Sequence, residues 1–493
     1  MSCYHGKATQ ESLSLAVFND KIRSSGTIKH PPMNFLFNLR QVINRLVSLV
    51  CAIALLASSI AIPQVQAAGL PLIRDAEIEG LMRIYTRPIF RAAGLNPRSV
   101  KVYLINQPNI NAFVAGGQRI FIHTGLLQQA ANPNEVIGVL AHETGHIAGA
   151  HLARLGSQIE KASNLAILSM LLGMAVAVGG AATNTKGAGQ IGQATVAGGQ
   201  SLARRNILSY VRAQESSADQ AALRYLTKSG QSGKGMLDLF HNLANKSLGS
   251  LRRTDPYTQS HPMPFERIRN LERMVKKSKY YNRKDPGVLL LRHHLMQAKL
   301  AGFLSSPRVV YRQYPKNNNS MPSRYARAIV SFRTGDIKNA LPLINSLIKD
   351  IPQNPYFWEL KGQALLESGR PRAAIKPLKI AIKKTSNNGL IAMLLARAYL
   401  GAGGKGNAKT ALSVLNKAKR TENDSPDLHF LLARAYGTTG NLPRAELETA
   451  ETALLRGDKP LALQKAKIAQ KRLKRGSPAW QRSKDIVNFA TRK

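Results

Sequence analysis

The sequence predicts a mostly α-helical chain, in which an α+β domain with a small sheet is followed by an α-helical solenoid. Three observations support this. The pattern His-Glu-x-x-His lies in an apolar helical segment, short β-branched segments precede it, and glycines recur every 34 residues in the C-terminal part. A length of 493 residues is enough for about two to four domains.

The charge of the chain is strongly positive, with a formal net charge of +43 at pH 7. Such a charge favours anionic partners, such as lipid headgroups, nucleic acid or acidic proteins. Solvated lysines and arginines that only keep the chain soluble are the alternative. No base-reading motif is present, so nucleic acid is not an expected partner. Both cysteines, Cys3 and Cys51, precede the expected mature start, so disulfides and cysteine metal ligands are not expected.

Residues 1–67 are expected to be an N-terminal extension and a signal peptide. The better signal pattern begins at Met33, the expected start of translation, with two arginines before an apolar run at 46–62 and small residues before Ala68. A retained anchor is the alternative, because 17 apolar residues lie at the lower edge for spanning a bilayer. Both interpretations predict export of the remaining chain.

The segment before the histidine motif predicts one amphipathic helix and two strands. Residues 75–95 have apolar side chains at helical spacing, and residues 100–105 and 119–124 are rich in β-branched side chains. The glycines at 116–117 suit the turn before the second strand. If 119–124 is an edge strand, it could pair with an extended peptide. An ordinary sheet edge is the alternative.

The histidine motif itself predicts half of a zinc site. His142 and His146 are four residues apart, so on a helix they share one face and can hold one zinc ion. Glu143 would reach a water molecule rather than the metal and act as a general base. Asn132 and Glu135 form a capping box at the expected helix start. An accidental surface cluster is the alternative, but these side chains in an apolar helix would need partners.

Two acidic residues downstream are the candidates that complete the site. Glu215 and Asp219 are also four residues apart and point in the same direction on a helix. Zinc bound by two histidines needs a third protein ligand and one open position, and Glu215 is the preferred choice. Asp219 then suits the orientation of a ligating histidine through its other ring nitrogen. Without the histidine motif, the same pair would be expected to form a solvated helix face.

Between these two motifs lies a long stretch of apolar and small residues. The apolar run at 165–178 has 14 residues, which is too short for a bilayer span, so we expect a buried helix or an interfacial segment. Residues 179–200 are rich in Gly, Ala and Thr without a clear period and are expected to form a mobile loop. This loop could be a lid over the active site or a contact with the membrane.

The C-terminal part carries an internal repeat. Gly335, Gly369 and Gly403 are spaced by 34 residues, which is the period of tetratricopeptide helix pairs. The pattern Leu-Ala-Arg-Ala-Tyr at 395–399 recurs at 432–436. This interval is 37 residues, so three extra residues are expected in the turn between the two helices of that repeat.

We therefore expect four repeats within 321–458, preceded by a helical connector at 286–320. The stacked pairs form a concave surface suited to unfolded polypeptide. Residues 459–493 are expected to be a basic capping helix and tail, with an apolar face in 461–475. Binding of this basic terminus to anionic lipid is the alternative.

Taken together, the motifs resemble those of the M48 zinc metalloendopeptidases. His-Glu-x-x-His is followed by Glu-x-x-Ala-Asp at 215–219, and then by Ser260-His261-Pro262 leading to Glu266-Arg267-Ile268. The resemblance implies a zincin-like metalloprotease domain, placed at 68–285, with one zinc ion held by His142, His146 and Glu215. It also implies Glu143 as the catalytic base. Family descriptions give Asp219 a proton-donor role, whereas its chemistry favours orientation of a histidine.

His261 has three open interpretations. It could stabilise an oxyanion, bind zinc as a fourth ligand in a latent form, or be a satisfied loop histidine. The export signal and the repeats match periplasmic members of the family. This implies a protease for unfolded or misfolded outer-membrane proteins, with outer-membrane assembly machinery as a partner. The rival is a chaperone or scaffold with a mostly latent site. Membrane contact through 165–178 and the basic C-terminus is a further expectation.

Overall fold

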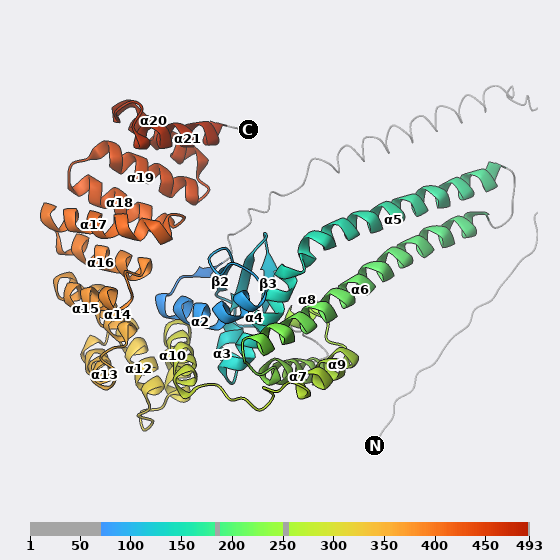
Figure 1. Cartoon of the computed structure of the whole chain (residues 1–493). Helices are drawn as coiled ribbons and strands as arrows, with labels where there is room; N and C mark the ends of the chain where they lie inside the picture. The colour runs from blue at the N-terminus through green and yellow to red at the C-terminus, as the bar shows by residue number, and fades with distance from the viewer. Residues whose placement is uncertain (1–70, 183–187, 250–255, 492–493) are drawn as a thin grey trace, which may run out of the picture. The chain divides into compact units, whose positions relative to one another are not determined.

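The computed structural model describes residues 71–182, 188–249 and 256–491 (Figure 1). The expected signal peptide within 1–67 lies outside these residues. The described chain is mostly helical and has one small sheet, which is the predicted fold class. No described helix is both long and apolar enough to cross a membrane.

The sheet has four short strands in the order β1-β2-β4-β3. Their bounds are Leu72–Ile73 for β1, Lys101–Ile105 for β2, Ala112–Ala115 for β3 and Arg119–His123 for β4. Strands β2 and β4 are parallel, and the two outer pairings are antiparallel. Gly116 and Gly117 both have positive φ in the turn between β3 and β4, which glycine adopts without strain.

The expectation that residues 119–124 form an edge strand is wrong. Strand β4 lies between β2 and β3 and is paired on both sides. The chain at 112–115 forms a hairpin with β4, and the rings of Phe113 and Tyr103 both stack on Phe121. Such cross-strand aromatic pairs stabilise an inner strand. Among the described strands, β3 is the edge next to β4.

The helices of the N-terminal part pack around this sheet and share one core. Its members are apolar side chains of the sheet and of α2, α3, α4, α6, α7, α8, α9 and α10. The bounds are α2 Ala76–Ala92, α3 Thr124–Gln129, α4 Pro133–Ala148, α5 His151–Ala182, α6 Ala188–Lys228, α7 Lys234–Gly249, α8 Pro256–Ser260, α9 Phe265–Lys276 and α10 Gly287–Leu304.

Helices α5 and α6 run side by side as a long hairpin, which Figure 1 shows in teal and green. The expected mobile loop at 179–200 is therefore wrong where it is described, because 179–182 and 188–200 are helical. The expectation of a buried helix at 165–178 is wrong for the described side chains of this run, because Leu168 and Leu171 are 53% and 55% exposed. The interfacial alternative stays a prediction.

The C-terminal part is a series of antiparallel helix pairs. Glycines with positive φ at 335, 369, 403 and 440 end the first helix of four pairs, as αL glycines commonly do. The bounds are α11 Pro307–Gln313, α12 Met321–Arg333, α13 Ile337–Asp350, α14 Pro355–Glu367, α15 Pro371–Lys384, α16 Gly389–Ala402, α17 Lys405–Glu422, α18 Pro426–Thr438, α19 Leu442–Leu455, α20 Lys459–Arg472 and α21 Pro478–Thr491.

Two details of the repeats differ from the expectation. The turn between α16 and α17 holds only Gly403 and Gly404, so the extra residues do not lie there. Helix α17 has 18 residues, whereas α13, α15 and α19 each have 14, so the insertion lengthens this helix instead. The expected C-terminal tail also contains a further helix, α21. It packs with α19 and α20 around the buried Ala462, Ala466 and Ala469, as a terminal cap would.

Candidate metal centre

The site begins with the local structure of α4. Asn132 caps this helix by accepting a hydrogen bond from the Glu135 backbone N–H at 3.1 Å. The Glu135 carboxylate in turn accepts from the Ala131 N–H at 3.0 Å, one residue before the position that a capping box would use. The helix carries His142, Glu143 and His146 on its way through the core. His142 and Glu143 are fully buried.

Gly145 in the histidine motif allows α6 to approach α4 closely. A side chain at Gly145 would place its Cβ 2.9 Å from the Ala218 carbonyl oxygen and 3.0 Å from the Ala218 Cα. These distances are too short for a real Cβ, so only glycine permits this contact between the two helices. Ala218 lies between Glu215 and Asp219, and the close approach therefore brings both carboxylates to the histidines.

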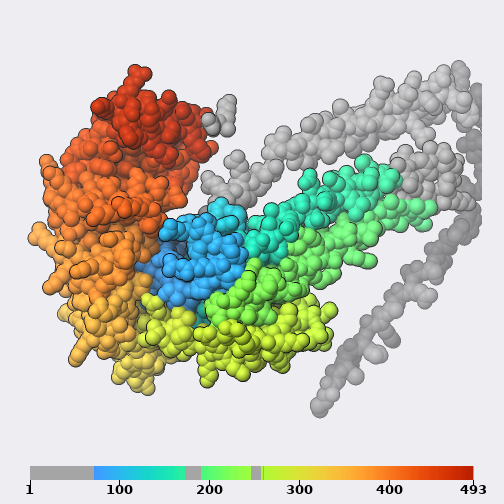
Figure 2. All heavy atoms as spheres, in the orientation of Figure 1, coloured from blue at the N-terminus to red at the C-terminus, as the bar shows by residue number. Residues whose placement is uncertain are grey.

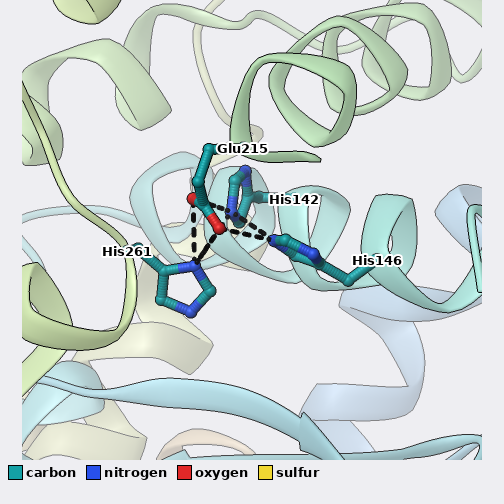
Figure 3. Close-up of side chains that lie close together, drawn as sticks. All are labelled: His142, His146, Glu215 and His261. Atoms are coloured by element: carbon teal, nitrogen blue, oxygen red, sulfur yellow. Dashed lines mark hydrogen bonds and ion pairs between the residues drawn. The ribbon is translucent and has the colours of Figure 1, made fainter. Parts of the chain in front are cut away.

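Four side chains converge at this point, His142, His146, Glu215 and His261 (Figure 3). One donor atom from each lies within 4.8 Å of all the others. Glu215 Oε2 and Oε1 are each 3.3 Å from the Nε2 atoms of His142 and His146, respectively. His261 Nδ1 is 3.1 Å from both Glu215 oxygens and 3.4 Å from His142 Nε2. The structure thus places the three predicted ligands together and adds His261 to them.

Asp219 lies behind this cluster and holds His142 from its other side. Asp219 Oδ1 is 2.9 Å from His142 Nδ1, so the Nε2 atom is directed toward Glu215. This contact is the one expected of a residue that orients a metal-binding histidine. Arg267 of α9 donates to both Asp219 oxygens at 2.7 and 2.8 Å, and its Nη1 lies 2.9 Å from Glu215 Oε2.

Glu143 follows His142 on α4 and lies next to His261. Its carboxylate is buried, and neither oxygen has a hydrogen-bond partner among the described residues. The His261 Nε2 atom is 3.5 Å from Glu143 Oε1 and also has no hydrogen-bond partner there. Buried polar groups are usually hydrogen-bonded, so these atoms mark a place where a further polar molecule fits.

The charges of the cluster shift the pKa values of its members in opposite directions. Burial alone would lower the pKa of His142, but hydrogen bonds with Asp219 and Glu215 raise it to about 9. Burial lowers the pKa of His146 to about 4 and raises the pKa of Glu143. Burial would also raise the pKa of Glu215, but its three histidine partners outweigh this and lower it. The site thus keeps the Glu215 carboxylate ionised and favours a cation beside it.

Sequence reasoning did not assign roles to three further residues. Arg267 belongs to the quoted Glu-Arg-Ile pattern, but its position beside two buried carboxylates follows only from the fold. His151 Nδ1 lies 3.0 Å from His146 Nδ1 and contacts this histidine from behind. The ring of Tyr257 lies 4.7 Å from that of His261 and supports the loop after α8. Two buried carboxylates, Glu215 and Asp219, need a cation beside them, and this need could have pointed to Arg267 in the sequence.

Comparisons with known proteins agree with this geometry. The sequence model of Peptidase family M48 matches residues 75–275, and that of the tetratricopeptide repeat matches 325–389 and 359–425. Metalloprotease YcaL from Escherichia coli (strain K12) is 30% identical over 195 residues, which cover 39% of this chain and 69% of that protein. The chain belongs to peptidase family M48. It is therefore a metalloendopeptidase, and the predictions of the family and of the enzyme class are confirmed.

Two longer alignments extend beyond the M48 region into the repeats. The beta-barrel assembly-enhancing protease of Yersinia pestis is 26% identical over 417 residues, covering 83% of this chain and 82% of that protein. The protein of the same name from Escherichia coli (strain K12) is 25% identical over 425 residues, with the same two shares. This M48 chain is thus similar to both relatives over its protease part and its repeats together.

Proposed function

We propose that this M48 enzyme is an exported, zinc-dependent endopeptidase that acts in the periplasm on unfolded or misfolded outer-membrane proteins. The protease domain spans 68–285 and follows a signal peptide within 1–67. The connector at 286–320 leads to the repeats at 321–458 and the cap at 459–493. The names of the two longer relatives support the link to β-barrel assembly.

The observation that carries this proposal is the arrangement of three donors around a buried base. His142, His146 and Glu215 present two nitrogens and a carboxylate to one point. Glu143 lies beside them with a buried carboxylate that has no hydrogen-bond partner among the described residues. A protein that only needed a stable core would gain nothing from this unpaired group, because burying it costs free energy.

The donor set fits zinc. Two imidazole nitrogens with a carboxylate are ligands that zinc accepts in catalytic sites, with one position left for substrate or water. The lowered pKa of Glu215 keeps this carboxylate ionised, as metal binding requires. When bound there by His142, His146 and Glu215, zinc would polarise the scissile carbonyl and lower the pKa of a water molecule.

The chain's own residues supply the proton transfers. Glu143 accepts a proton from the attacking water and then donates it to the leaving amine of the cleaved peptide. Asp219 keeps the His142 ring in the orientation that aims Nε2 at Glu215, and Arg267 holds Asp219 in place. Asp219 thus acts through His142 and does not itself donate a proton to substrate.

The repeats provide the second part of the function. Paired helices with a concave surface suit extended polypeptide, so they would hold an unfolded substrate or a component of the assembly machinery. An anionic membrane surface is a further proposed partner, in contact with 165–178 and the basic C-terminus. Nucleic acid is not proposed.

A second candidate function, a chaperone or scaffold with a mostly latent site, is favoured by one observation. His261 Nδ1 lies 3.1 Å from both Glu215 oxygens, inside the donor cluster. A fourth protein ligand at zinc would occupy the position that water needs and silence cleavage. The alternative role of His261, hydrogen bonding to an oxyanion, would instead make it necessary for cleavage.

The test of the proposed function is cleavage of an unfolded outer-membrane protein by the parent chain and by Glu143→Gln. We expect cleavage to fall by at least about 100-fold in the variant, because the base is lost. Zinc content, measured by elemental analysis, should stay at one ion per chain in both proteins. Glu272→Gln on α9 is the matched control, because this part-exposed glutamate pairs with Lys276 one turn along the same helix and should leave cleavage unchanged.

The same assay applied to His261→Ala separates the two roles of this histidine. A latent site predicts faster cleavage after the substitution, whereas an oxyanion role predicts slower cleavage. If neither the parent nor Glu143→Gln contains zinc, the assignment of the metal site is wrong. The repeat scaffold is then the better interpretation.

A further inference from the structure

The outer half of the α5–α6 hairpin exposes large apolar side chains to solvent. We define the distal hairpin as residues 162–172 of α5 and 190–203 of α6. The face seen in Figure 2 shows these two helices packed on each other. The large apolar side chains of the distal hairpin that are about half exposed are Ile167, Leu168, Met170, Leu171, Leu172, Ile191 and Leu202.

These side chains do not form the narrow stripe of an amphipathic helix. At about 100° per residue, the five exposed apolar positions of α5 cover an arc of about 200° around the helix. Ser169 lies on the remaining side, which faces α6. A helix on a protein surface in water normally turns polar residues outward. Between Ile167 and Leu172, α5 instead turns apolar residues to every side that α6 does not cover.

The contact between the two helices is built from small residues. A Cβ at Gly199 of α6 would lie 1.9 Å from Ser169 Oγ and 2.1 Å from Ser169 Cβ of α5. Ala162 and Ala203, one on each helix, are also buried at 8% and 6% exposure. Close approach through Gly, Ala and Ser is the mode in which helices associate in lipid, where packing rather than apolar burial holds them together.

The charges of the hairpin lie at its root and are mostly positive. In the sequence between Lys161 and Arg204, Lys186 is the single charged residue, and it lies in the segment 183–187 that is not described. The contact of Ser169 with Gly199 sets an antiparallel register, which puts Lys161, Arg204 and Arg205 at about the same level. We name these three residues the basic band. Glu160 is the one acidic residue beside it.

We propose that the distal hairpin inserts into one face of an anionic lipid bilayer, with the basic band at the level of the headgroups. Apolar side chains leave water for hydrocarbon, while lysine and arginine meet lipid phosphates. Both helices of the hairpin begin at the basic band, so the hairpin enters and leaves the bilayer by the same face. This proposal deepens the membrane contact named above and rests on the proposed export of the enzyme.

The consequence for the enzyme concerns its location. Helix α6 carries the distal hairpin at one end and Glu215 and Asp219 at the other. Insertion of the hairpin would therefore hold the catalytic centre at the membrane surface. Unfolded membrane proteins expose apolar segments and gather at such a surface, so anchoring concentrates the enzyme beside its proposed substrates.

The first experiment is flotation of the full chain with vesicles that contain phosphatidylglycerol, compared with vesicles of phosphatidylcholine alone. We expect the parent chain to bind the anionic vesicles. The double variant Leu168→Glu with Leu171→Glu should bind more than about tenfold less, because charge in hydrocarbon is costly. Arg204→Gln with Arg205→Gln should lower binding to the anionic vesicles by about 10- to 30-fold. All variants share residues 1–69, so binding by this part is a constant background.

Insertion is measured directly with a tryptophan in the hairpin. Leu171→Trp should be quenched by lipids brominated in their acyl chains, above the signal that Trp358 and Trp480 give in the parent chain. The matched control is Val288→Glu with Leu442→Glu, two side chains that are 74% and 53% exposed and lie outside both proposed membrane contacts. This control should bind vesicles as the parent does.

Three outcomes would overturn the proposal. They are equal binding by the parent and by Leu168→Glu with Leu171→Glu, no quenching of Leu171→Trp, or a dimer in solution that this double variant dissolves. The last outcome would mean that a second copy covers the hairpin. Cleavage of a soluble unfolded protein without vesicles should be unchanged in the hairpin variants, so loss of the membrane role is distinguishable from loss of the peptidase.

Discussion

The two ends of α6 lie in opposite environments, and each departs from the usual distribution of residues in a folded protein. At the C-terminal end, Glu215 and Asp219 are charged and only 4% and 2% exposed. At the N-terminal end, Ile191 and Leu202 are apolar and 57% and 52% exposed. Charged groups are normally outside and large apolar groups inside. One helix therefore combines two unfavourable arrangements, buried charges at its C-terminal end and exposed apolar side chains at its N-terminal end.

The two ends of α6 differ in how the free-energy cost of these arrangements is offset. The buried carboxylates have partners within the chain, because Arg267 and the imidazoles contact both of them. For the exposed leucines and isoleucines, the hairpin partner covers one side only. The centre can therefore form in the isolated chain, whereas the distal hairpin is stabilised by a surrounding apolar phase. The comparison distinguishes the metal centre, whose charges are paired within the chain, from the distal hairpin, whose apolar surface needs an external partner.

The largest effect is expected from removing the cation at the buried end of α6. Arg267→Met leaves Asp219 and Glu215 buried without their guanidinium partner. Breaking a buried ion pair by removing one partner typically costs about 3–5 kcal/mol, so the free energy of unfolding should fall by this amount. Chemical denaturation followed by circular dichroism measures it.

Lys276→Met on the same helix is the matched control for this substitution. Lys276 pairs with Glu272 at 2.7 Å, but its side chain is 59% exposed. An exposed ion pair contributes little, so this variant should unfold at nearly the same denaturant concentration as the parent. Equal destabilisation by the two variants would contradict the view that burial makes the Arg267 pair important.

The next effect concerns the orientation of the metal ligand. Asp219→Asn keeps the shape of the side chain but removes the charge that faces His142 Nδ1 at 2.9 Å. Loss of such an outer contact typically lowers metal affinity by about 10- to 100-fold. Competition with a zinc chelator measures this affinity. Asp238→Asn, which alters an exposed pair with Lys234, should leave it unchanged. If Asp219→Asn binds zinc as tightly as the parent, Asp219 does not orient His142 for metal binding.

Much of the buried end of α6 could be predicted from the sequence, because its motifs are local. His142 with His146 and Glu215 with Asp219 are pairs four residues apart, and helical geometry alone places each pair on one face. Zinc chemistry then predicts that the two faces meet. Arg267 could not be placed in this way, because its contacts with Asp219 depend on how α9 packs against α6.

The exposed end of the same helix was harder to predict. Residues 179–200 are rich in glycine, which lowers intrinsic helix propensity, so a loop was the local expectation. Pairing with α5 through Gly199 overrides this propensity, and no sequence period reveals it. The strand at 119–124 shows the same limit. Its position between β2 and β3 follows from the hairpin with 112–115, which alternation along one strand does not encode.

A smaller effect should follow from two adjacent glycines in the hairpin. Gly199→Ala forces a methyl group against Ser169, and overpacking of this kind costs about 1–3 kcal/mol. Gly198→Ala meets no atom within 4 Å and should instead stabilise the helix by up to about 1 kcal/mol. Hydrogen exchange of the α5 and α6 amides measures both. Similar exchange in the two variants would show that the hairpin contact at Gly199 is not formed in solution.

The last prediction compares Glu215 with a second buried carboxylate, Glu359 of α14. Partners lower the pKa of Glu215, whereas burial raises the pKa of Glu359 to about 8. Lys299 lies 3.8 Å from Glu359 but is closer to Asp75 and Glu77, at 2.7 and 3.3 Å. One cation therefore faces three carboxyl groups, and the favoured folded state keeps a proton on Glu359.

Glu359→Gln replaces this protonated carboxyl with an amide of the same shape. Because the folded pKa is raised above the unfolded value, the stabilising contribution of the proton is present below about pH 4.5 and is lost as pH rises toward about 8. Below about pH 4.5 the difference in unfolding free energy between the variant and the parent should therefore not change with pH. The variant should become the more stable of the two as pH rises to 8, and the difference should then level off. A difference in unfolding free energy that does not change with pH would show that Glu359 is ionised in the folded chain, as Glu215 is.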